Sequence, residues 1–427
     1  MTSKSMSPEV AIDGRDRPVV IVGAGHAGIQ SADALRSEGY EGPIVLVEGD
    51  AAFPYQRPPL SKDFLGEQDT EPLPLPLRAE SFFTDRAIDF RPSVAATGID
   101  RGAGRLTLSD GAQINYSSLV IATGAEARTL PVPGIDLAGV LSLRTLADAQ
   151  SLRERLCGAR HVVVAGAGFI GLEFAAAARR RGLEVTVLEA ADRVMSRALT
   201  PQLSDYLASR HRDMGTAIRT GEGITALVGR DGAVTSAIST TGREYAADLV
   251  LLGVGVVPRV GLARSAGLAV DNGIVVDHTL RTADPRIYAV GDCSNFPSPD
   301  GQSRLRLESV QSAAGHGRHV AAAIIGRVDA YADLPLFWSH QGDVRLQIAG
   351  LVRAGDDAVI VGDVTTGRFS VFAFRDSQLV AVESVNRPGD HSAARRVLQT
   401  PDRPSVADVR LPGFTLKNFA AHLAPPS

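Results

Sequence analysis

Two glycine-rich loops in the chain of 427 residues have the residue types and spacing that bind the phosphates of a dinucleotide. Each loop follows an apolar run and has the pattern GxGxxG: Gly23, Gly25 and Gly28 in the first, and Gly166, Gly168 and Gly171 in the second. The first glycine of such a loop permits a tight turn, the second lets a pyrophosphate approach the backbone, and the third allows a helix to pack closely on a strand. The following helix offers free N–H groups to the phosphates.

An acidic residue follows each loop at the spacing of a ribose ligand. Glu48 comes 20 residues after Gly28, and Glu189 comes 18 residues after Gly171. The expected spacing is about 20 residues, and such a carboxylate accepts hydrogen bonds from ribose hydroxyls. A glycine turn in some other α/β unit is the alternative for either loop alone. Because loop and acid recur together, we predict two dinucleotide-binding sites.

The elements that must position these loops are two copies of one unit: strand, glycine turn, alanine-rich helix and second strand. The first copy begins near residue 18 and ends at Glu48, and the second runs from residue 161 to Glu189. Two such sites imply two different dinucleotides, a bound flavin and a visiting nicotinamide. The strand-like runs at 120–128 and 286–296 would complete a domain that the second copy interrupts.

The composition is that of an ordinary globular protein. The length and the hydrophobic fraction of 44% favour two or three domains. The net charge of −4 provides no basic surface for a nucleic-acid backbone. The chain starts without the apolar segment of a signal peptide, and its apolar runs are shorter than the roughly 20 residues that span a bilayer. We therefore expect a cytoplasmic protein with no nucleic-acid or membrane partner.

The two cysteines, Cys157 and Cys293, exclude several kinds of chemistry. They are too few for a disulfide framework and lack the spacing of a metal site or a redox dithiol. An iron–sulfur cluster generally needs four ligands, so any such cluster must lie on a partner. Cys293 is interpreted as a small packing residue.

The chain resembles the two-dinucleotide-binding flavoproteins, and more narrowly the NADH-dependent ferredoxin reductases of bacterial cytochrome P450 and Rieske oxygenase systems. The resemblance covers nearly the whole chain and rests on nine segments in order: VGAGHAG, PYQRPPLSK, ATGAEAR, LRTLADA, GAGFIGLE, YAVGDCSNF, RLESVQSA, FWSHQGDVRLQIAG and VNRPGDHSAARR. It implies an α/β fold of two Rossmann-like domains with a C-terminal α+β interface domain. The implied division is a disordered leader (1–16), a discontinuous FAD-binding domain (17–127 and 258–334), a NAD-binding domain (128–257) and the interface domain (335–427).

The implied function is electron transfer from NADH through tightly bound FAD to a small acidic [2Fe–2S] ferredoxin, which supplies a P450 or Rieske oxygenase. One alternative is a rubredoxin or quinone reductase, although the C-terminal segment LPGFTLKNFAAHLAPPS is too short and weakly basic to bind a membrane. Another is a flavoprotein of the apoptosis-inducing-factor kind, in which NADH binding switches a protein interaction. The absence of a targeting segment and of a basic surface argues against that alternative.

The resemblance also implies the cofactor contacts. It places Ala27 at the FAD pyrophosphate, Lys62 and Arg144 beside the cofactor, Asp292 on the ribityl chain and Val310 near the isoalloxazine ring. Four further positions within the shared segments are expected to bind a cofactor, namely Arg57, Thr123, Gly124 and Ile170, and Gly255 is expected to do so as well.

Three residues are candidates for the redox chemistry. In similar reductases the lysine and glutamate corresponding to Lys62 and Glu173 meet near flavin N5, where a nicotinamide stacks; an exposed acid in the first turns of a helix is the alternative for Glu173. Hydride transfer needs positioning and charge near the ring more than acid–base groups. The resemblance places the single tryptophan, Trp338, at the far side of the flavin, in contact with the cofactor and near the docked acceptor, with a core residue as its alternative. His340 and Gly342 depart from the family pattern, which has an acid and an aromatic there.

Charged residues give two further expectations. Glu189 would repel a 2′-phosphate, which favours NADH over NADPH, with Arg193 as the nearest residue that could offset this repulsion. The basic residues between 300 and 400 are all arginine, the residue best suited to pair with carboxylates of an acidic ferredoxin. The arginines expected to contribute to docking include Arg304, Arg306, Arg318, Arg345 and Arg353.

Overall fold

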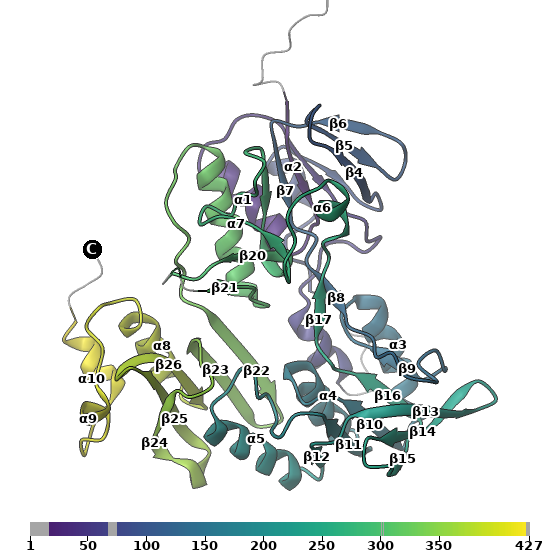
Figure 1. The fold of residues 1–427 in the computed structure, drawn as a ribbon, viewed down its shortest axis with the longest axis vertical. Helices are drawn as coiled ribbons and strands as arrows, with labels where there is room; N and C mark the ends of the chain where they lie inside the picture. The colour runs from purple at the N-terminus through teal and green to yellow at the C-terminus, as the bar shows by residue number, and fades with distance from the viewer. Residues whose placement is uncertain (1–16, 67–74, 300, 302, 424–427) are drawn as a thin grey trace, which may run out of the picture. The chain divides into compact units, whose positions relative to one another are not determined.

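The computed structural model describes residues 17–66, 75–299, 301 and 303–423 (Figure 1). The chain forms two compact units. The first unit holds the described residues up to Tyr55, with Pro76–Ala125 and Pro258–Ala332. The second unit holds the described residues of Gln56–Leu75, Glu126–Val257 and the chain from Asp333 onward. The predicted leader lies outside the described residues, and the finer division into domains stays a prediction.

The first unit is built on a parallel five-stranded sheet in the order β19-β7-β1-β2-β3. Its strands are β1 (Val19–Val22), β2 (Ile44–Val47), β3 (Ile88–Arg91), β7 (Ser118–Ile121) and β19 (Ile287–Ala289). Every residue of β1 and β2 is buried, as expected for central strands of a parallel sheet covered on both faces. The helices are α1 (His26–Ser37), α2 (Ser81–Asp85), α6 (Gly261–Ser265) and α7 (Val310–Ile324).

Two small sheets complete the first unit. One is antiparallel and contains β4 (Ala96–Asp100), β5 (Arg105–Leu108) and β6 (Gln113–Asn115). The other contains β18 (Ile274–Val275), β20 (Ser294–Pro297) and β21 (Arg304–Leu305), and the short 3-10 helix η4 (Gly291–Cys293) precedes β20.

The second unit repeats the parallel sheet, here in the order β12-β11-β10-β16-β9. Its strands are β9 (Val140–Ser142), β10 (His161–Ala165), β11 (Glu184–Glu189), β12 (Ala217–Thr220) and β16 (Leu249–Leu252). The helices are α3 (Leu146–Leu156), α4 (Phe169–Arg180) and α5 (Pro201–Asp213), and the antiparallel sheet β13 (Ile224–Arg230), β14 (Ala233–Ser239) and β15 (Glu244–Ala246) packs on one face. Two parallel sheets with the same loop-and-helix unit confirm the predicted fold class.

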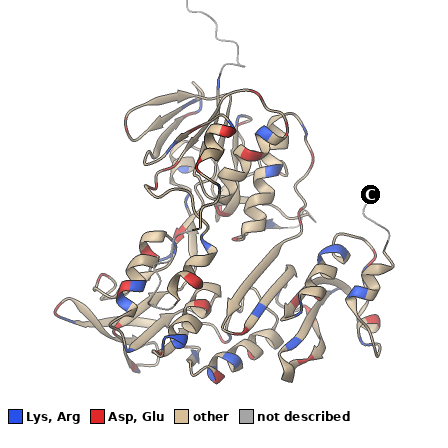
Figure 2. Cartoon of the chain, turned by 180° about the vertical axis from the view of Figure 1, so that it is seen from behind, with Lys and Arg blue, Asp and Glu red and all other residues tan. Residues whose placement is uncertain are grey.

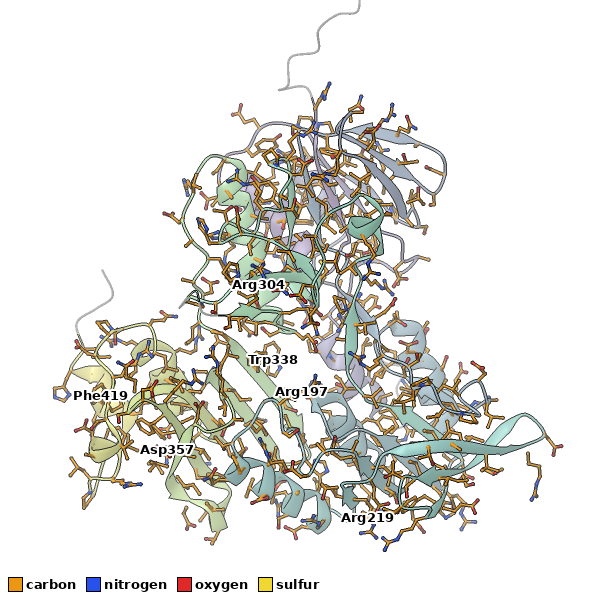
Figure 3. All side chains as sticks on the ribbon, in the orientation of Figure 1. Arg197, Arg219, Arg304, Trp338, Asp357 and Phe419 are labelled. Atoms are coloured by element: carbon orange, nitrogen blue, oxygen red, sulfur yellow. The ribbon has the colours of Figure 1, made fainter. Side chains whose placement is uncertain are left out.

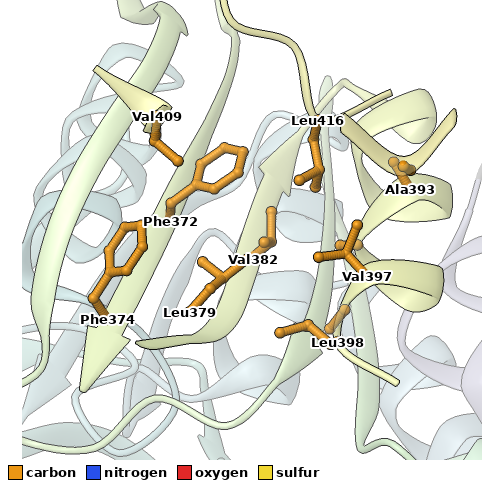
Figure 4. Close-up of a cluster of buried hydrophobic side chains, with 12 residues drawn as sticks. Phe372, Phe374, Leu379, Val382, Ala393, Val397, Leu398, Val409 and Leu416 are labelled. Atoms are coloured by element: carbon orange, nitrogen blue, oxygen red, sulfur yellow. The ribbon is translucent and has the colours of Figure 1, made fainter. Parts of the chain in front are cut away.

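The C-terminal part of the second unit is an antiparallel sheet with helices on one face. Its order is β22 (Leu336–Gln341), β23 (Val344–Gly350), β26 (Gln378–Val385), β25 (Arg368–Arg375) and β24 (Asp357–Asp363). Side chains of β25 and β26 form a buried core with α8 (Pro388–Val397), α9 (Val406–Val409) and α10 (Leu416–Ala421), as Figure 4 shows.

Short elements join these parts. They are the paired strands β8 (Ala125–Ala127) and β17 (Val256–Pro258) and the 3-10 helices η2 (Pro58–Ser61), η3 (Asp63–Leu65) and η5 (Val364–Thr366). In Figure 2, residues of both charges are spread over the helices of each unit. Within the described ranges, every helix is too short or too polar to cross a bilayer.

Candidate functional site

The two glycine-rich loops have nearly the same geometry. Gly23 has φ of +105° and Gly166 has φ of +93°, in the left-handed region that favours glycine. A Cβ on Gly23 would lie 2.4 Å from the carbonyl oxygen of Ala122, and one on Gly166 would lie 2.6 Å from that of Gly253. Each loop therefore packs against the backbone that follows the neighbouring strand, with no room for a side chain.

The second and third glycines of each loop have the different surroundings that the pattern predicts. A Cβ on Gly28 would lie 1.8 Å, and one on Gly171 2.1 Å, from the carbonyl oxygen of the first glycine of the same loop. By contrast, nothing lies within 4 Å of a Cβ on Gly25, and only one oxygen, at 4.0 Å, lies near a Cβ on Gly168. The third glycine is thus required by packing, while the second leaves open space for a phosphate.

The two acids predicted to bind ribose are held by their own loops. The carboxylate of Glu48 accepts a hydrogen bond of 2.6 Å from the backbone N–H of Ala24, and that of Glu189 accepts one of 2.6 Å from Ala167. Each carboxylate accepts a second backbone N–H from two residues further along the chain. The sequence analysis missed Ala24 and Ala167, although both occupy the second position of GxGxxG.

The FAD-contact positions predicted in the first unit lie after β7, after β19 and in the first turns of α1 and α7. Thr123 follows β7 and donates its hydroxyl to the carbonyl of Arg259 at 2.7 Å, and Gly124 has φ of +67°. Asp292 lies in η4, and Val310 is the first residue of α7. Ala27 is buried in the first turn of α1.

The turn that carries Asp292 has one partner that the sequence did not indicate, His316. The N–H of Gly291 donates to Nδ1 of His316 at 3.0 Å. Burial lowers the pKa of His316 to about 3, which keeps that nitrogen free to accept. The thiol of Cys293 is fully buried and donates to two backbone carbonyls, and burial raises its pKa. Cys293 therefore packs as expected and does not supply a thiolate.

The remaining cofactor positions lie in the second unit. Arg57 precedes η2, and the backbone N–H of Arg144 donates to Asp148 at 2.9 Å ahead of α3. Ile170 is 39% exposed at the start of α4, an apolar side chain next to the second glycine loop. Gly255 has φ of +93°. The contacts of these four residues with a cofactor remain predictions.

Glu173 joins three segments of the second unit. Its side chain is only 2% exposed. One carboxylate oxygen accepts from the ammonium of Lys62 at 2.8 Å and from the hydroxyl of Ser61 at 2.5 Å, and the other accepts from the hydroxyl of Ser339 at 2.7 Å. These donors stabilise the charged carboxylate in a buried position. The alternative of an exposed acid at the helix start is therefore wrong for Glu173, and the catalytic role stays a prediction.

The ammonium of Lys62 is held from two sides. It donates to the carbonyl of Pro58 at 3.1 Å and to Glu173, and its side chain is 15% exposed. An ammonium has three N–H donors. Its third N–H has no hydrogen-bond partner among the described residues, so it can bind a ligand at the exposed end of the side chain.

Strand β22 presents different residues on its two faces, as a strand does. Ser339 and Gln341 are fully buried, whereas Trp338 is partly buried and His340 is exposed (Figure 3 labels Trp338). Partial burial and the charge of Lys62 lower the pKa of His340. The role of Trp338 at an acceptor site stays a prediction. Ser61, Ser339 and Gln341 could have been found from their places in PYQRPPLSK and FWSHQ.

Arg193, the residue that could offset repulsion between Glu189 and a 2′-phosphate, is bound by neighbouring residues. The guanidinium of Arg193 donates to the carbonyls of Ser196 and Leu199 and to the hydroxyl of Ser204, at 2.7 to 2.8 Å.

Two of the predicted docking arginines are also engaged. Arg304 donates to the side chain of Asn295 and to the carbonyl of Val276, and Arg306 pairs with Glu308 at 2.7 Å. The backbone N–H of Arg345 donates to Asn386, while its residue is exposed. Arg304 and Arg345 are both exposed, whereas Arg306 is only partly exposed, so exposure alone does not distinguish Arg304 from Arg345 as a docking contact.

Two glycine loops with paired acids, on two parallel sheets and with an added C-terminal sheet, define a two-dinucleotide-binding oxidoreductase. The chain belongs to the pyridine nucleotide-disulphide oxidoreductase family, whose model matches residues 17–317. A second model, described as reductase C-terminal, matches residues 336–420. Members of the family depend on FAD and NAD(P), which confirms the predicted cofactor pair.

Known proteins match nearly the whole chain. Rhodocoxin reductase of Rhodococcus erythropolis is 46% identical, covering 90% of this chain and 89% of that protein. Rubredoxin-NAD(+) reductase of Pseudomonas putida is 38% identical, covering 90% of this chain and all of that protein. The crystal structure of a ferredoxin reductase for the CYP199A2 system of Rhodopseudomonas palustris is 44% identical, with a TM-score of 0.92 over 94% of this chain and 99% of that one. The predicted family resemblance and enzyme class are confirmed.

Proposed function

We propose that the chain is a cytoplasmic reductase that passes electrons from NADH through FAD to a small acidic [2Fe–2S] ferredoxin, which supplies a P450 or Rieske oxygenase. The chain has two cysteines, of which Cys293 is buried and Cys157 is exposed. Without a dithiol, electrons have no protein redox group to pass through and must go from the flavin to an external carrier. The similarity to rhodocoxin reductase and to the CYP199A2-system reductase supports a ferredoxin as that carrier.

The residues of the chain have separate tasks in this proposal. The first glycine loop and Glu48 bind FAD together with Ala27, Thr123 and Asp292, and FAD supplies hydride acceptance and single-electron donation when bound. The second loop and Glu189 bind NADH.

The observation that carries the proposal for the NADH half-reaction is the buried contact between Lys62 and Glu173. Glu173 belongs to the helix that follows the second glycine loop, so the pair lies in the nucleotide-binding part of the second unit. We propose that Glu173 fixes the position of the Lys62 ammonium. The third N–H of that ammonium then contacts the reacting cofactors. Such fixed charge and positioning are what hydride transfer requires from a protein.

The choice of electron acceptor is tested by comparing kcat/KM for purified acceptor proteins. Purified protein should contain non-covalent FAD and reduce rhodocoxin with NADH, at a rate that falls as ionic strength rises. The second candidate is a rubredoxin reductase, which the 38% identity to rubredoxin-NAD(+) reductase favours. A kcat/KM for a purified rubredoxin above that for rhodocoxin would favour that candidate. Protein that cannot be loaded with FAD would exclude both.

A further inference from the structure

A continuous chain of buried hydrogen bonds connects the C-terminal sheet to Glu173. The ring Nε2 of His211, on α5, contacts the side-chain oxygen of Gln341 at 3.0 Å. The side-chain nitrogen of Gln341 donates to the hydroxyl of Ser339 at 3.0 Å, and that hydroxyl donates to Glu173 at 2.7 Å. His211, Gln341 and Ser339 are 0% exposed, and Glu173 is 3% exposed. All four residues belong to the second unit.

The direction of each hydrogen bond in this chain is determined by the chemistry of the groups. The amide oxygen of Gln341 can only accept, so Nε2 of His211 must donate. The Gln341 amide nitrogen can only donate, so the Ser339 hydroxyl accepts from it and donates to Glu173. Burial lowers the pKa of His211, which keeps its ring neutral. All the donors therefore point toward one end, the Glu173 carboxylate.

Gln341 also supports the second glycine loop. Its side-chain nitrogen lies 3.6 Å from the sulfur of Met195. The backbone N–H of Met195 donates to the carbonyl of Ala167 at 2.9 Å, and the N–H of Ala167 donates to Glu189. One side chain of the C-terminal sheet thus contacts both the residues that hold Glu173 and the segment that holds the nucleotide loop.

We infer that Ser339 and Gln341 are positioning residues of the NADH half-reaction. One face of β22 completes the NADH site through these two side chains, while Trp338 belongs to the opposite face. The C-terminal domain, whose expected role is to face the acceptor, would then also set the rate at which NADH reduces the flavin. The inference rests on the proposed function, because it assigns NADH to the second glycine loop.

The experiment compares two half-reactions of the FAD-loaded protein. Flavin reduction by NADH is followed anaerobically in a stopped-flow instrument, and reoxidation of dithionite-reduced protein by ferricyanide is followed separately. Gln341→Leu and Ser339→Ala should lower the limiting rate of reduction roughly tenfold or more, because small displacements of a positioned group are costly. The rate of reoxidation by ferricyanide should remain at the wild-type value.

Two further variants separate positioning from stability. Ser339→Thr keeps the hydroxyl and should recover most of the rate that Ser339→Ala loses. Ser370→Ala is the matched control, since Ser370 is an equally buried serine of the same sheet that bonds to Asp390 and Ser384 instead. In Ser370→Ala, NADH should reduce the flavin at the wild-type rate.

The outcomes are distinct. Wild-type reduction rates in both Ser339→Ala and Gln341→Leu, or equal losses in the two half-reactions, would overturn the inference. If Gln341→Leu does not fold, the comparison of Ser339→Ala with Ser339→Thr still decides. A wild-type protein whose flavin NADH does not reduce would instead contradict the proposed function itself.

Discussion

The two glycine loops share their geometry but differ in what packs on the helix that follows each. On α1, the residue two positions after the third glycine is Gln30, and on α4 the corresponding residue is Glu173. Helix α1 packs directly on α7, where a Cβ on Gly317 would lie 2.9 Å from both the carbonyl of Ala27 and the Cβ of Gln30. Helix α4 instead meets Lys62 and Ser339 through a buried charge.

This difference shows how one nucleotide-binding unit can serve two tasks. The helix after the first loop is fixed by close, apolar helix packing, which suits a cofactor that stays bound. The helix after the second loop carries a charged group linked to two other segments, which suits a cofactor that must arrive, react and leave. We therefore expect the loop to bind the dinucleotide in both cases and the neighbours of the helix to determine the chemistry.

The largest expected effect comes from filling the third glycine position of each loop. Gly28→Ala should yield protein without FAD, because a Cβ there would lie 1.8 Å from a backbone oxygen. Gly171→Ala should retain FAD but lose NADH-dependent flavin reduction by roughly 100-fold or more, because the loop must shift. Flavin absorbance after gel filtration and stopped-flow reduction measure the two effects.

The matched controls are glycines with free space around them. Gly98→Ala in the first unit and Gly158→Ala in the second should leave both properties unchanged, since nothing lies within 4 Å of a Cβ at either position. If Gly171→Ala lost FAD and Gly28→Ala kept it, the assignment of the two loops would be reversed.

The second prediction tests the difference between the corresponding helix positions. Glu173→Gln leaves the Lys62 ammonium without its carboxylate and should slow reduction of the flavin by NADH by roughly 10- to 100-fold. Gln30→Ala, at the corresponding position of α1, should have little effect on this rate. Both variants should purify with FAD. Equal rates for Glu173→Gln and the wild type would show that the charge of Glu173 has no part in the reaction.

The fold and the two nucleotide loops could be predicted from local sequence, because the strand, turn, helix and acid lie within some 30 residues of one another. The hydrogen-bonded chain from His211 to Glu173 could not. Its members come from α4, α5 and β22, and only the packing of those elements brings them together. Sequence also suggested Arg193 as a partner for a 2′-phosphate, whereas its guanidinium is bound to the start of α5.

The third prediction concerns the nucleotide. NADH should be preferred over NADPH, because the carboxylate of Glu189 is fixed at the loop and Arg193 already donates to three protein oxygens. Glu189→Ala should lower kcat/KM for NADH about tenfold, the loss expected for hydrogen bonds to a charged group, and should lower that for NADPH much less. Comparable kcat/KM values of the wild-type protein for the two nucleotides would contradict this assignment.

The smallest expected effect is on stability and comes from a second buried acid of the same unit, Glu383. Unlike Glu173, it has no paired ammonium within the described part of the chain, where its hydrogen-bond donors are the backbone N–H and the hydroxyl of Thr200, at the start of α5. Burial raises the pKa of Glu383 to about 7. The folded protein therefore holds a proton there that the unfolded chain has lost above its ordinary pKa of roughly 4.3. The contribution of this proton to the free energy of unfolding is complete below that pKa and is lost as the pH rises toward 7.

Glu383→Gln removes this titration while keeping the size of the side chain. Between pH 5 and pH 8, the Tm of the wild-type protein should therefore fall by a few degrees relative to that of Glu383→Gln. Glu173→Gln provides the contrast, because the lost carboxylate is one that accepts hydrogen bonds from the Lys62 ammonium and from two hydroxyls. Its Tm should be lower than that of the wild type at both pH values, since breaking a buried ion pair leaves an uncompensated charge. A difference in Tm between wild type and Glu383→Gln that is the same at pH 5 and pH 8 would show that Glu383 does not titrate between these two pH values.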